Sequence, residues 1–251
     1  MQAELRQKLI EEYLQEVEFA SLEELSEKVD ASLSTIRRDL GILSNTSRIK
    51  RTHGGARLIQ PAKEEFVFSK RQQVESNAKE RVAHLCARLI SPNQNLFLDA
   101  GTTVFEVARK LEEKTPHIVT NSLSIANFYA GHRDIEVVVT GGVIYPRLQT
   151  LVGPLAVNAY KSLNADIAIL GGGGATKEGI MNSHMLLIDI QRTMIESAQK
   201  VIFCLDASKI GRSSFTPLCG WDSVDVLVTN REAPKSLISH FKKQGVEVLL
   251  A

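Results

Sequence analysis

The sequence is poor in cysteine and in long apolar runs. Its 251 residues include only three cysteines, Cys86, Cys204 and Cys219, without a C-x-x-C motif or a Cys/His pairing. This pattern excludes a disulfide framework and a cysteine-based zinc site, so we expect small buried thiols and a cytoplasmic protein. No apolar run approaches the roughly 20 residues of a membrane-spanning helix, and we expect no membrane partner.

Aromatic residues and net charge are also scarce. Aromatics make up 6% of the chain, and 30 basic residues almost balance 29 acidic ones, for a net charge of +1. The overall charge therefore argues neither for nor against a polyanionic partner, and the local distribution of charge must decide. Residues 1–30 contain three basic and nine acidic residues, whereas residues 31–60 contain six basic residues and one acidic residue. The basic half either faces a polyanion or forms an ordinary solvated surface.

Apolar residues at helical spacing predict three helices within the first 45 residues. Leucines recur at this spacing along the first segment, and Ser21 with Glu24 forms the capping-box pattern that opens a second helix. Ser32 caps a third helix, in which Ile36 and Leu40 point inward. Two short helices joined by about three or four residues predict a helix-turn-helix unit.

The third helix and the segment after it carry residues suited to DNA. Hydroxyl and guanidinium groups on the first two turns match base edges and phosphates of the major groove. Residues 48–58 alternate basic and apolar side chains around Gly54-Gly55, which predicts a basic β-hairpin, or wing, along phosphates. The residues that we expect to contact DNA are Ser32, Ser34, Thr35, Arg37, Arg38, Arg48, Lys50, Arg51, His53, Gly54 and Gly55.

A change of pattern near residue 77 predicts a second, larger domain. Residues 59–76 include the polar segment around Pro61 and a charged stretch, which is typical of a linker. Short apolar strands then alternate with helices, as in an α/β sheet. We expect a winged helix-turn-helix domain at residues 1–58, a linker at 59–76 and an α/β domain at 77–251.

The predicted strands of this larger domain end in small polar or glycine-rich turns. Four of them lie at residues 95–98, 117–120, 135–140 and 166–170. In an open α/β sheet such turns share one carboxyl edge, where ligands bind. The glycine run 171–174 can present consecutive N–H groups to a phosphate, or it can simply be a flexible turn. A later strand adds Asp206 and Lys209 to the same edge.

Two sets of motifs resemble a known family. The string Ser34-Thr35-Ile36-Arg37-Arg38-Asp39-Leu40, followed by Arg51-Thr52-His53-Gly54-Gly55-Ala56, resembles the winged helix of DeoR-family bacterial transcription regulators. The D-x-G-T-T, T-N-S and D-x-S-K turns resemble the sensor domain of that family, so the resemblance covers essentially the whole chain. It implies an N-terminal winged helix-turn-helix plus a C-terminal α/β sensor domain related to sugar-phosphate isomerase and CoA-transferase-like folds.

The resemblance also implies a phosphorylated sugar or sugar derivative as effector. The residues that it implies for the pocket are Asp99, Gly101, Thr102, Thr103, Thr120, Asn121, Ser122, Gly141, Gly171, Gly172, Asn182 and Lys209. Many members have a Glu near the start of the helix after the glycine loop, where this chain has residues 182–189 instead. This difference leaves the identity of the effector open.

An enzyme is the main alternative. A sugar-phosphate isomerase-like enzyme with an appended DNA-binding domain needs a base and an electrophile together. Ribose-5-phosphate isomerases carry a Lys just before the glycines, where this chain has Leu170, and the preceding strand offers only Asp166. We therefore expect no enzyme, no cofactor and no metal. A purely architectural DNA-binding protein would have no use for the polar sheet edge.

Together these features predict a regulator of transcription. We expect a repressor of a carbohydrate-metabolism operon that binds double-stranded operator DNA as a homodimer or homotetramer. It would be cytoplasmic, bacterial and nucleoid-associated when bound to DNA, and a sugar phosphate would control it. Asp39, an acid in a phosphate-facing helix, is expected to pair with a neighbouring Arg and to orient it.

Overall fold

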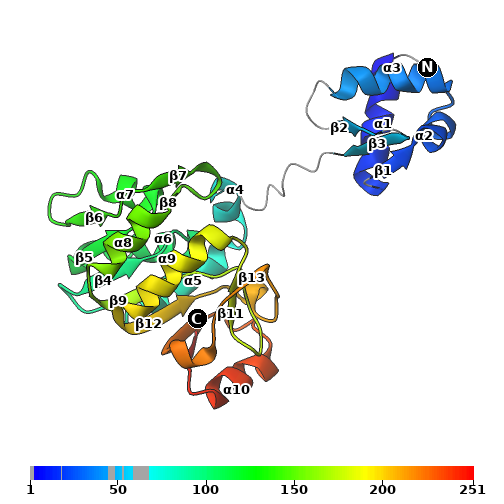
Figure 1. Ribbon diagram of the computed structural model, residues 1–251. Helices are drawn as coiled ribbons and strands as arrows, with labels where there is room; N and C mark the ends of the chain where they lie inside the picture. The colour runs from blue at the N-terminus through cyan, green and yellow to red at the C-terminus, as the bar shows by residue number, and fades with distance from the viewer. Residues whose placement is uncertain (1–2, 18, 45–48, 53, 59–67) are drawn as a thin grey trace. The chain divides into compact units, whose positions relative to one another are not determined.

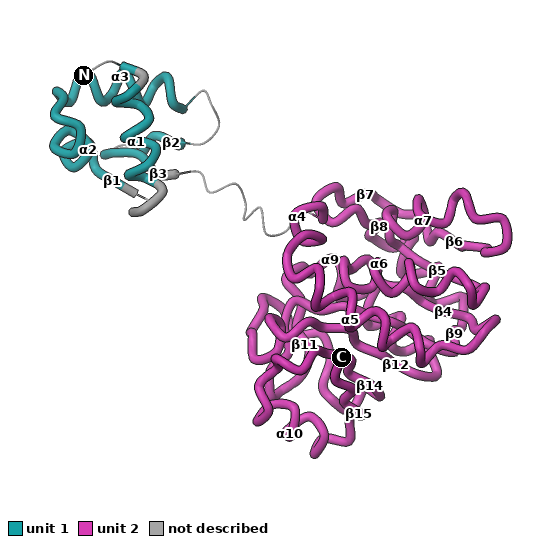
Figure 2. The backbone as a smooth tube through the Cα atoms, turned by 180° about the vertical axis from the view of Figure 1, so that it is seen from behind, with its two compact units in different colours: residues 1–65 teal, residues 66–251 magenta. Residues whose placement is uncertain are grey.

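The chain forms two compact units, residues 1–65 and 66–251 (Figures 1 and 2). The computed structural model describes residues 3–17, 19–44, 49–52, 54–58 and 68–251. Helix α4 (Phe68–Gln73) belongs to the second unit, because the Phe68 ring packs edge-on against Phe105, with centroids 5.8 Å apart. The described part of the expected linker therefore lies in the larger unit, and residues 59–67 lie outside the described residues.

Unit 1 combines three helices with a small antiparallel sheet. Its elements are α1 (Ala3–Val17), β1 (Phe19–Ser21), α2 (Leu22–Lys28), α3 (Leu33–Leu43), β2 (Ile49–Arg51) and β3 (Gly55–Leu58). Strand β3 pairs with both β1 and β2, so the hairpin of β2 and β3 forms the wing. The predicted winged helix-turn-helix is confirmed, and strand β1 is an addition that the sequence pattern did not predict.

The predicted caps start helices α2 and α3. Ser21 Oγ accepts a hydrogen bond from the Glu24 amide at 3.1 Å, and Glu24 Oε2 accepts one from the Ser21 amide at 2.7 Å. This reciprocal pair is the capping box that the sequence predicts. At α3, Ser32 Oγ accepts from the Thr35 amide at 3.3 Å. The apolar face of α3 is buried against α1 and α2.

A buried ion pair joins α1 to α3. The Asp39 carboxylate accepts hydrogen bonds from Arg6 Nε at 2.6 Å, Arg6 Nη2 at 3.2 Å and Gln7 Nε2 at 3.0 Å. Burial raises the pKa of Asp39, but the bonds from Arg6 and Gln7 outweigh it and leave the pKa below its ordinary value. The expected partner is corrected: it is Arg6 of α1, 33 positions away, rather than an arginine beside Asp39 on α3.

Unit 2 is built on a seven-stranded sheet in which every neighbouring pair is parallel. The order is β15-β14-β12-β9-β4-β5-β6. These strands are β4 (Asn95–Leu98), β5 (His117–Thr120), β6 (Val137–Val139), β9 (Ala165–Leu170), β12 (Ala198–Cys204), β14 (Val226–Thr229) and β15 (Glu247–Leu250). Their apolar sequences match a sheet that is covered on both faces.

Helices cover both faces of this sheet (Figures 1 and 2). One face packs on α5 (Ser76–Ala87), α6 (Thr102–Ala108) and α7 (Leu123–Tyr129), and the other on α8 (Pro154–Lys161), α9 (Met185–Glu196) and α10 (Lys235–Lys243). Strand β4 shows the alternation: Leu96 and Leu98 join one apolar cluster and Phe97 the other. The predicted α/β domain is confirmed.

The strand order reverses between β4 and β9. From β4 the chain adds β5 and β6 on one side, and from β9 it adds β12, β14 and β15 on the other. Such a reversal opens a crevice at the carboxyl ends of the two central strands, where α/β proteins bind ligands. We call the carboxyl ends of β4 and β9, with the turns that follow them, the switch-point edge.

Two smaller sheets flank the large one. Strands β7 (Val143–Tyr145) and β8 (Thr150–Val152) form an antiparallel hairpin. Strands β10 (Gly174–Ala175), β11 (Ile180–Asn182) and β13 (Thr216–Cys219) form a three-stranded antiparallel sheet after the glycine run. The sequence pattern did not predict either sheet.

Within the described residues, no helix is both long and apolar enough to cross a membrane, and no three His, Cys, Asp or Glu side chains are grouped to hold a metal ion. Cys86 and Cys204 are buried free thiols, as predicted, whereas Cys219 is only partly buried.

We predict that Asp39→Asn lowers the melting temperature at pH 7, because it removes the buried ion pair with Arg6. Since the folded-state pKa of Asp39 is lowered, its contribution is present above the ordinary value of 3.8 and is lost as the pH falls through the lower folded value. The difference from the wild type should therefore shrink in acid. Calorimetry of the full chain measures this, with the exposed Asp30→Asn as matched control. Equal effects of both variants would contradict the assignment.

Candidate functional site

Asp99 lies at the centre of the switch-point edge. It follows β4 directly and is 3% exposed. Its Oδ2 accepts hydrogen bonds from the Gly171 amide at 3.2 Å and from Gln191 Nε2 at 2.7 Å. Its Oδ1 is buried and has no hydrogen-bond partner among the described residues. One carboxylate oxygen is thus held rigidly, while the other can accept a bond from a ligand.

Gln191 links three of the predicted site residues. This fully buried side chain of α9 donates to Asp99 and to the Gly171 carbonyl at 3.0 Å, and accepts from Asn182 Nδ2 at 2.7 Å. Asn182 Oδ1 in turn accepts from the Ser183 amide at 2.7 Å. Gln191 was not among the predicted site residues, although its place as a polar residue on the buried face of an apolar helix was a signal that the sequence offered.

The environment of Asp99 disfavours its charge. Burial raises the pKa of Asp99 above its ordinary value, although the hydrogen bonds from Gly171 and Gln191 and the charge of Arg71 act in the opposite direction. Buried titratable groups with shifted pKa values often mark functional sites. A carboxylate kept here at a cost to stability is consistent with a role in binding.

The glycines at this edge allow close packing of the two turns. The Cα atoms of Gly101 and Gly171 lie so near each other that a Cβ on Gly101 would be 3.8 Å from the Gly171 Cα. Thr102 and Thr103 are buried in the first turn of α6, directly after Gly101. The structure thus brings the Asp99 turn and the glycine run together, as the sequence pattern predicts.

The glycine run does not present a row of free amides. The Gly171 N–H donates to Asp99 and the Gly173 N–H donates to the Met181 carbonyl at 2.8 Å. A Cβ on Gly174 would lie 2.1 Å from the Arg212 carbonyl oxygen, so that glycine is required by packing. The idea of consecutive N–H groups around a phosphate is therefore corrected, and Gly172 lies between the two engaged amides.

Thr120, Asn121 and Ser122 make their polar contacts within the protein. Thr120 Oγ1 donates to the Leu98 carbonyl at 2.7 Å, and Ser122 Oγ accepts from the Ile125 amide as the cap of α7. Asn121 Nδ2 donates to Thr150 Oγ1, and its Oδ1 accepts from Tyr160. The contacts of these three side chains therefore stabilise the turn between β5 and α7.

Gly141 follows β6, two strands away from β4. A Cβ on Gly141 would have no residue within 4 Å apart from its chain neighbours, so no packing contact of the described residues requires a glycine there.

Asp206 and Lys209 lie on the other side of β9, after β12. Asp206 is 2% exposed and caps the short helix η5 (Ala207–Lys209), where it accepts from the Ser208 amide at 3.1 Å and from the Ser208 hydroxyl. Lys209 is half-buried at the end of η5. Because β12 is next to β9 in the sheet, this turn extends the switch-point edge.

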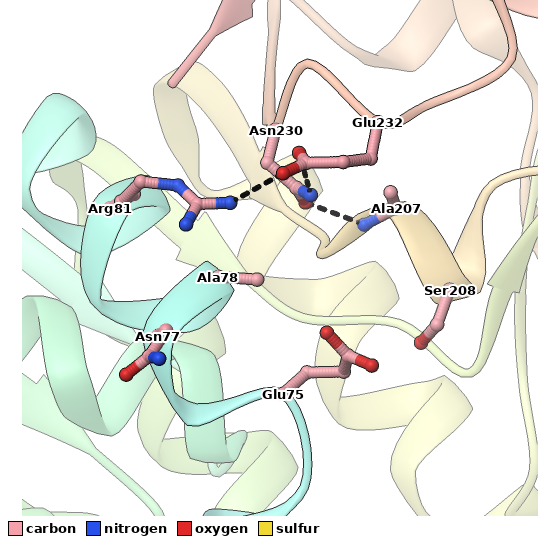
Figure 3. Close-up of a pocket in the computed structure, with 8 residues that line it drawn as sticks. All are labelled: Glu75, Asn77, Ala78, Arg81, Ala207, Ser208, Asn230 and Glu232. Atoms are coloured by element: carbon pink, nitrogen blue, oxygen red, sulfur yellow. Dashed lines mark hydrogen bonds and ion pairs between the residues drawn. The ribbon is translucent and has the colours of Figure 1, made fainter.

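A polar pocket of about 560 Å³ adjoins this turn (Figure 3). It lies between the start of α5 and the turns after β12 and β14. Arg81 donates to Glu232 at 2.8 Å, and Asn230 bridges Glu232 and the Ala207 amide. The lining residues are Glu75, Asn77, Ala78, Arg81, Ala207, Ser208, Asn230 and Glu232. None of these was among the predicted site residues.

In unit 1, the face of α3 that is expected to contact DNA is exposed to solvent. Ser34, Arg37 and Arg38 are exposed, and Thr35 is partly exposed. Ser32 is also exposed, but its hydroxyl is engaged with the cap and lies 2.9 Å from the hydroxyls of Ser34 and Thr35. Two guanidinium groups and two hydroxyl side chains therefore share the first turns of one helix.

The wing lies beside this helix. A Cβ on Gly41 of α3 would be 3.9 Å from Arg51 Nη1, so the exposed Arg51 of β2 reaches α3. Gly54 is exposed at the turn, whereas a Cβ on Gly55 would be 2.1 Å from the Ala20 carbonyl oxygen, so packing against β1 requires that glycine. Arg48, His53 and the side chain of Lys50 lie outside the described residues.

The residues of the alternative isomerase site are not arranged for catalysis. Leu170 is fully buried. Asp166 Oδ2 accepts from the Asn95 amide at 2.8 Å, at the starts of β9 and β4 and thus at the opposite end of the strands from Asp99.

Comparison with known proteins assigns both units. The model of the DeoR C terminal sensor domain matches residues 74–231, and that of the DeoR-like helix-turn-helix domain matches residues 6–62. A solved structure of ribose 5-phosphate isomerase A from Methanocaldococcus jannaschii is similar at a TM-score of 0.40 and 16% identity, over 54% of this chain and 55% of that chain. A likeness at this level carries no functional argument.

Curated relatives match over nearly their whole lengths. The transcriptional regulator GlpR of Haloferax volcanii is 31% identical over 97% of this chain and 96% of the relative. The transcriptional repressor GlcR of Bacillus subtilis is 30% identical over 100% of this chain and 97% of the relative. The L-fucose operon activator of Haemophilus influenzae is 27% identical over 98% of this chain and 99% of the relative. With both of its domains matched and its relatives named for regulation and not for catalysis, the chain belongs to the DeoR family of helix-turn-helix transcriptional regulators.

Proposed function

We propose that a phosphorylated sugar or sugar derivative binds at the switch-point edge and controls DNA binding by unit 1. The observation that carries this proposal is Asp99 Oδ1, a buried carboxylate oxygen without a partner among the described residues, at the reversal of strand order. A buried acceptor without a donor is costly, and a sugar hydroxyl supplies the missing donor. The edge is also the usual ligand position in such sheets.

Basic side chains around this edge support an anionic group on the ligand. Lys209 lies at the end of the neighbouring η5 turn. Lys79 of α5 is 5% exposed, and burial lowers its pKa to about 8 against the opposing charge of Asp206. Arg71 and Lys209 act on the same ammonium group, so several cations gather within one region. A phosphate is the anionic group that metabolic sugars carry.

For DNA, we propose that the exposed face of α3 enters the major groove. Arg37 and Arg38 are the candidates for base and phosphate contacts, with Ser34 and Thr35 beside them. Arg51, and Arg48 and Lys50 of the same segment, would add phosphate contacts. A symmetric homodimer or homotetramer would present two such helices to half-sites one helical turn, about 34–36 Å, apart. The protein would then act on the bacterial nucleoid, in the cytoplasm.

We further propose repression of a carbohydrate-metabolism operon as the sign of regulation. Relatives of similar identity are named as a repressor and as an activator, and the repressor is the more similar of the two. In either case the effector changes DNA binding only if it binds the DNA-competent and incompetent states with different affinities.

The DNA interface is tested with Arg38→Gln and Arg37→Gln. We expect each to weaken binding to DNA from upstream of the protein's own gene by roughly 10- to 100-fold, the value of one lost bidentate contact. Lys8→Gln, an exposed change on α1, is the matched control. In fluorescence anisotropy, wild-type affinity should fall by about 10³ to 10⁵ between 50 and 200 mM salt, given roughly 6 to 10 phosphate contacts. Affinity that does not depend on salt would exclude the proposed interface.

The effector site is tested by calorimetric titration with a panel of hexose, pentose, polyol and triose phosphates. We expect one class to bind the wild type, and Asp99→Ala or Lys209→Ala to weaken it by at least tenfold, about 1.4 kcal/mol, as expected for a lost charged hydrogen bond. Both variants should still bind the upstream DNA. Wild-type affinity in both variants would rule out this position for the site.

Asp99 should also reduce stability. Because its folded-state pKa is raised, its contribution to stability is present below the ordinary value and is lost as the pH rises through the raised one. Asp99→Asn keeps an acceptor for Gly171 and Gln191 and removes the buried charge. We therefore expect it to melt at a higher temperature than the wild type at pH 7, with a smaller difference in acid. Asp189→Asn, exposed on α9, is the control. A lower melting point for Asp99→Asn would refute this account.

A further inference from the structure

Helix α4 is the first described element after residues 59–67, and it packs on α6, the helix that follows β4 and Asp99. Phe68 is buried against Phe105 of α6, and Gln72 Nε2 donates to Glu106 Oε1 at 3.5 Å. Since residues three and four positions apart share a helix face, Arg71 lies on the side of α4 that adjoins α6. Helix α4, the first described element of unit 2, therefore lies against the helix that follows the Asp99 turn.

Lys79 fixes the end of this helix. Its Nζ donates to the carbonyls of Arg71 and Val74, which are the groups that a helix leaves without partners at its C-terminus. A buried ammonium group at this place also interacts favourably with the helix dipole. Lys79 of α5 thus fixes the backbone of Arg71, and this contact does not involve the Arg71 side chain.

The guanidinium group of Arg71 lies close enough to the acidic residues of the edge to interact with their charges. Burial lowers the pKa of Arg71, and the carboxylates of Asp99 and Asp206 oppose this effect, while Arg212 adds to it. In the described part of the chain, neither carboxylate is within ion-pair distance of Arg71, and its guanidinium makes no hydrogen bond. A partly buried cation and the buried Asp99 Oδ1 thus lie near each other, each without a direct partner in that part of the chain.

We propose that Arg71 binds the anionic group of the effector while Asp99 Oδ1 accepts a bond from one of its hydroxyl groups. A molecule that carries both groups would supply a partner to each side chain, since guanidinium binds phosphate through two parallel hydrogen bonds. The inference rests on the proposed function and adds a residue that the sequence analysis placed in the linker. It also gives the ligand a direct contact with the helix that follows residues 59–67.

The test is calorimetric titration of the full chain with the sugar phosphate that binds the wild type most tightly in the panel, and with its unphosphorylated sugar. We expect Arg71→Gln to weaken binding of the sugar phosphate by roughly 10- to 100-fold and to affect the unphosphorylated sugar less than threefold, because only the phosphate contact is lost. Arg88→Gln makes the same change of charge at the far end of α5 and should leave binding within about twofold. Asp99→Asn should weaken both ligands.

If Arg71→Gln binds the sugar phosphate as tightly as the wild type does, the inference is overturned. If Asp99→Asn loses binding of the sugar phosphate in the same series, the proposed function still stands. A wild type that binds no member of the panel would overturn both. If Arg71→Gln does not fold, Arg71→Lys decides: a point charge cannot reproduce two parallel bonds, so weaker binding of the phosphate alone supports the inference and unchanged binding refutes it.

Discussion

All seven strands of the large sheet run parallel, so a crossover must join each strand to the next and all carboxyl ends lie on one edge. The reversal of strand order between β4 and β9 then separates the turns after these two strands into a crevice. Asp99 follows one strand and Gly171 the other, and they are joined by a hydrogen bond across the reversal. The position of the candidate site is a consequence of this topology.

At that position the chain keeps a carboxylate whose charge is disfavoured by burial. The amide of Gly171 and the side chain of Gln191 satisfy one oxygen of Asp99, and the other has no partner among the described residues. Proteins commonly accept lower stability where a binding group must be ready before the ligand arrives. Unit 1 shows the opposite use of a buried acid: Asp39 is fully paired with Arg6 and Gln7 and holds α3 in place.

Patterns of residues close together in sequence were enough to predict much of the fold. The Ser21–Glu24 and Ser32 caps, the apolar face of α3 and the polar turns after β4 and β9 each depend on residues close together in sequence. What the sequence analysis missed depends on distant partners: Gln191 contacts Asp99 across 92 positions, and Arg6 contacts Asp39 across 33. The glycine run shows the same limit. Its composition suggested consecutive N–H groups for a phosphate, but the contacts with Met181 and Arg212, which the sequence does not show, determine what Gly173 and Gly174 do.

The central claim is that the switch-point edge and the DNA-binding unit are energetically coupled, which requires the effector to bind the two DNA-binding states unequally. The most direct measurement is the dissociation constant for upstream DNA, by anisotropy, with and without a saturating sugar phosphate of the class that binds. The account predicts at least a tenfold change in the wild type and, at the same sugar-phosphate concentration, a smaller change in Asp99→Ala. An unchanged constant in a wild type that binds both DNA and the sugar phosphate would contradict it.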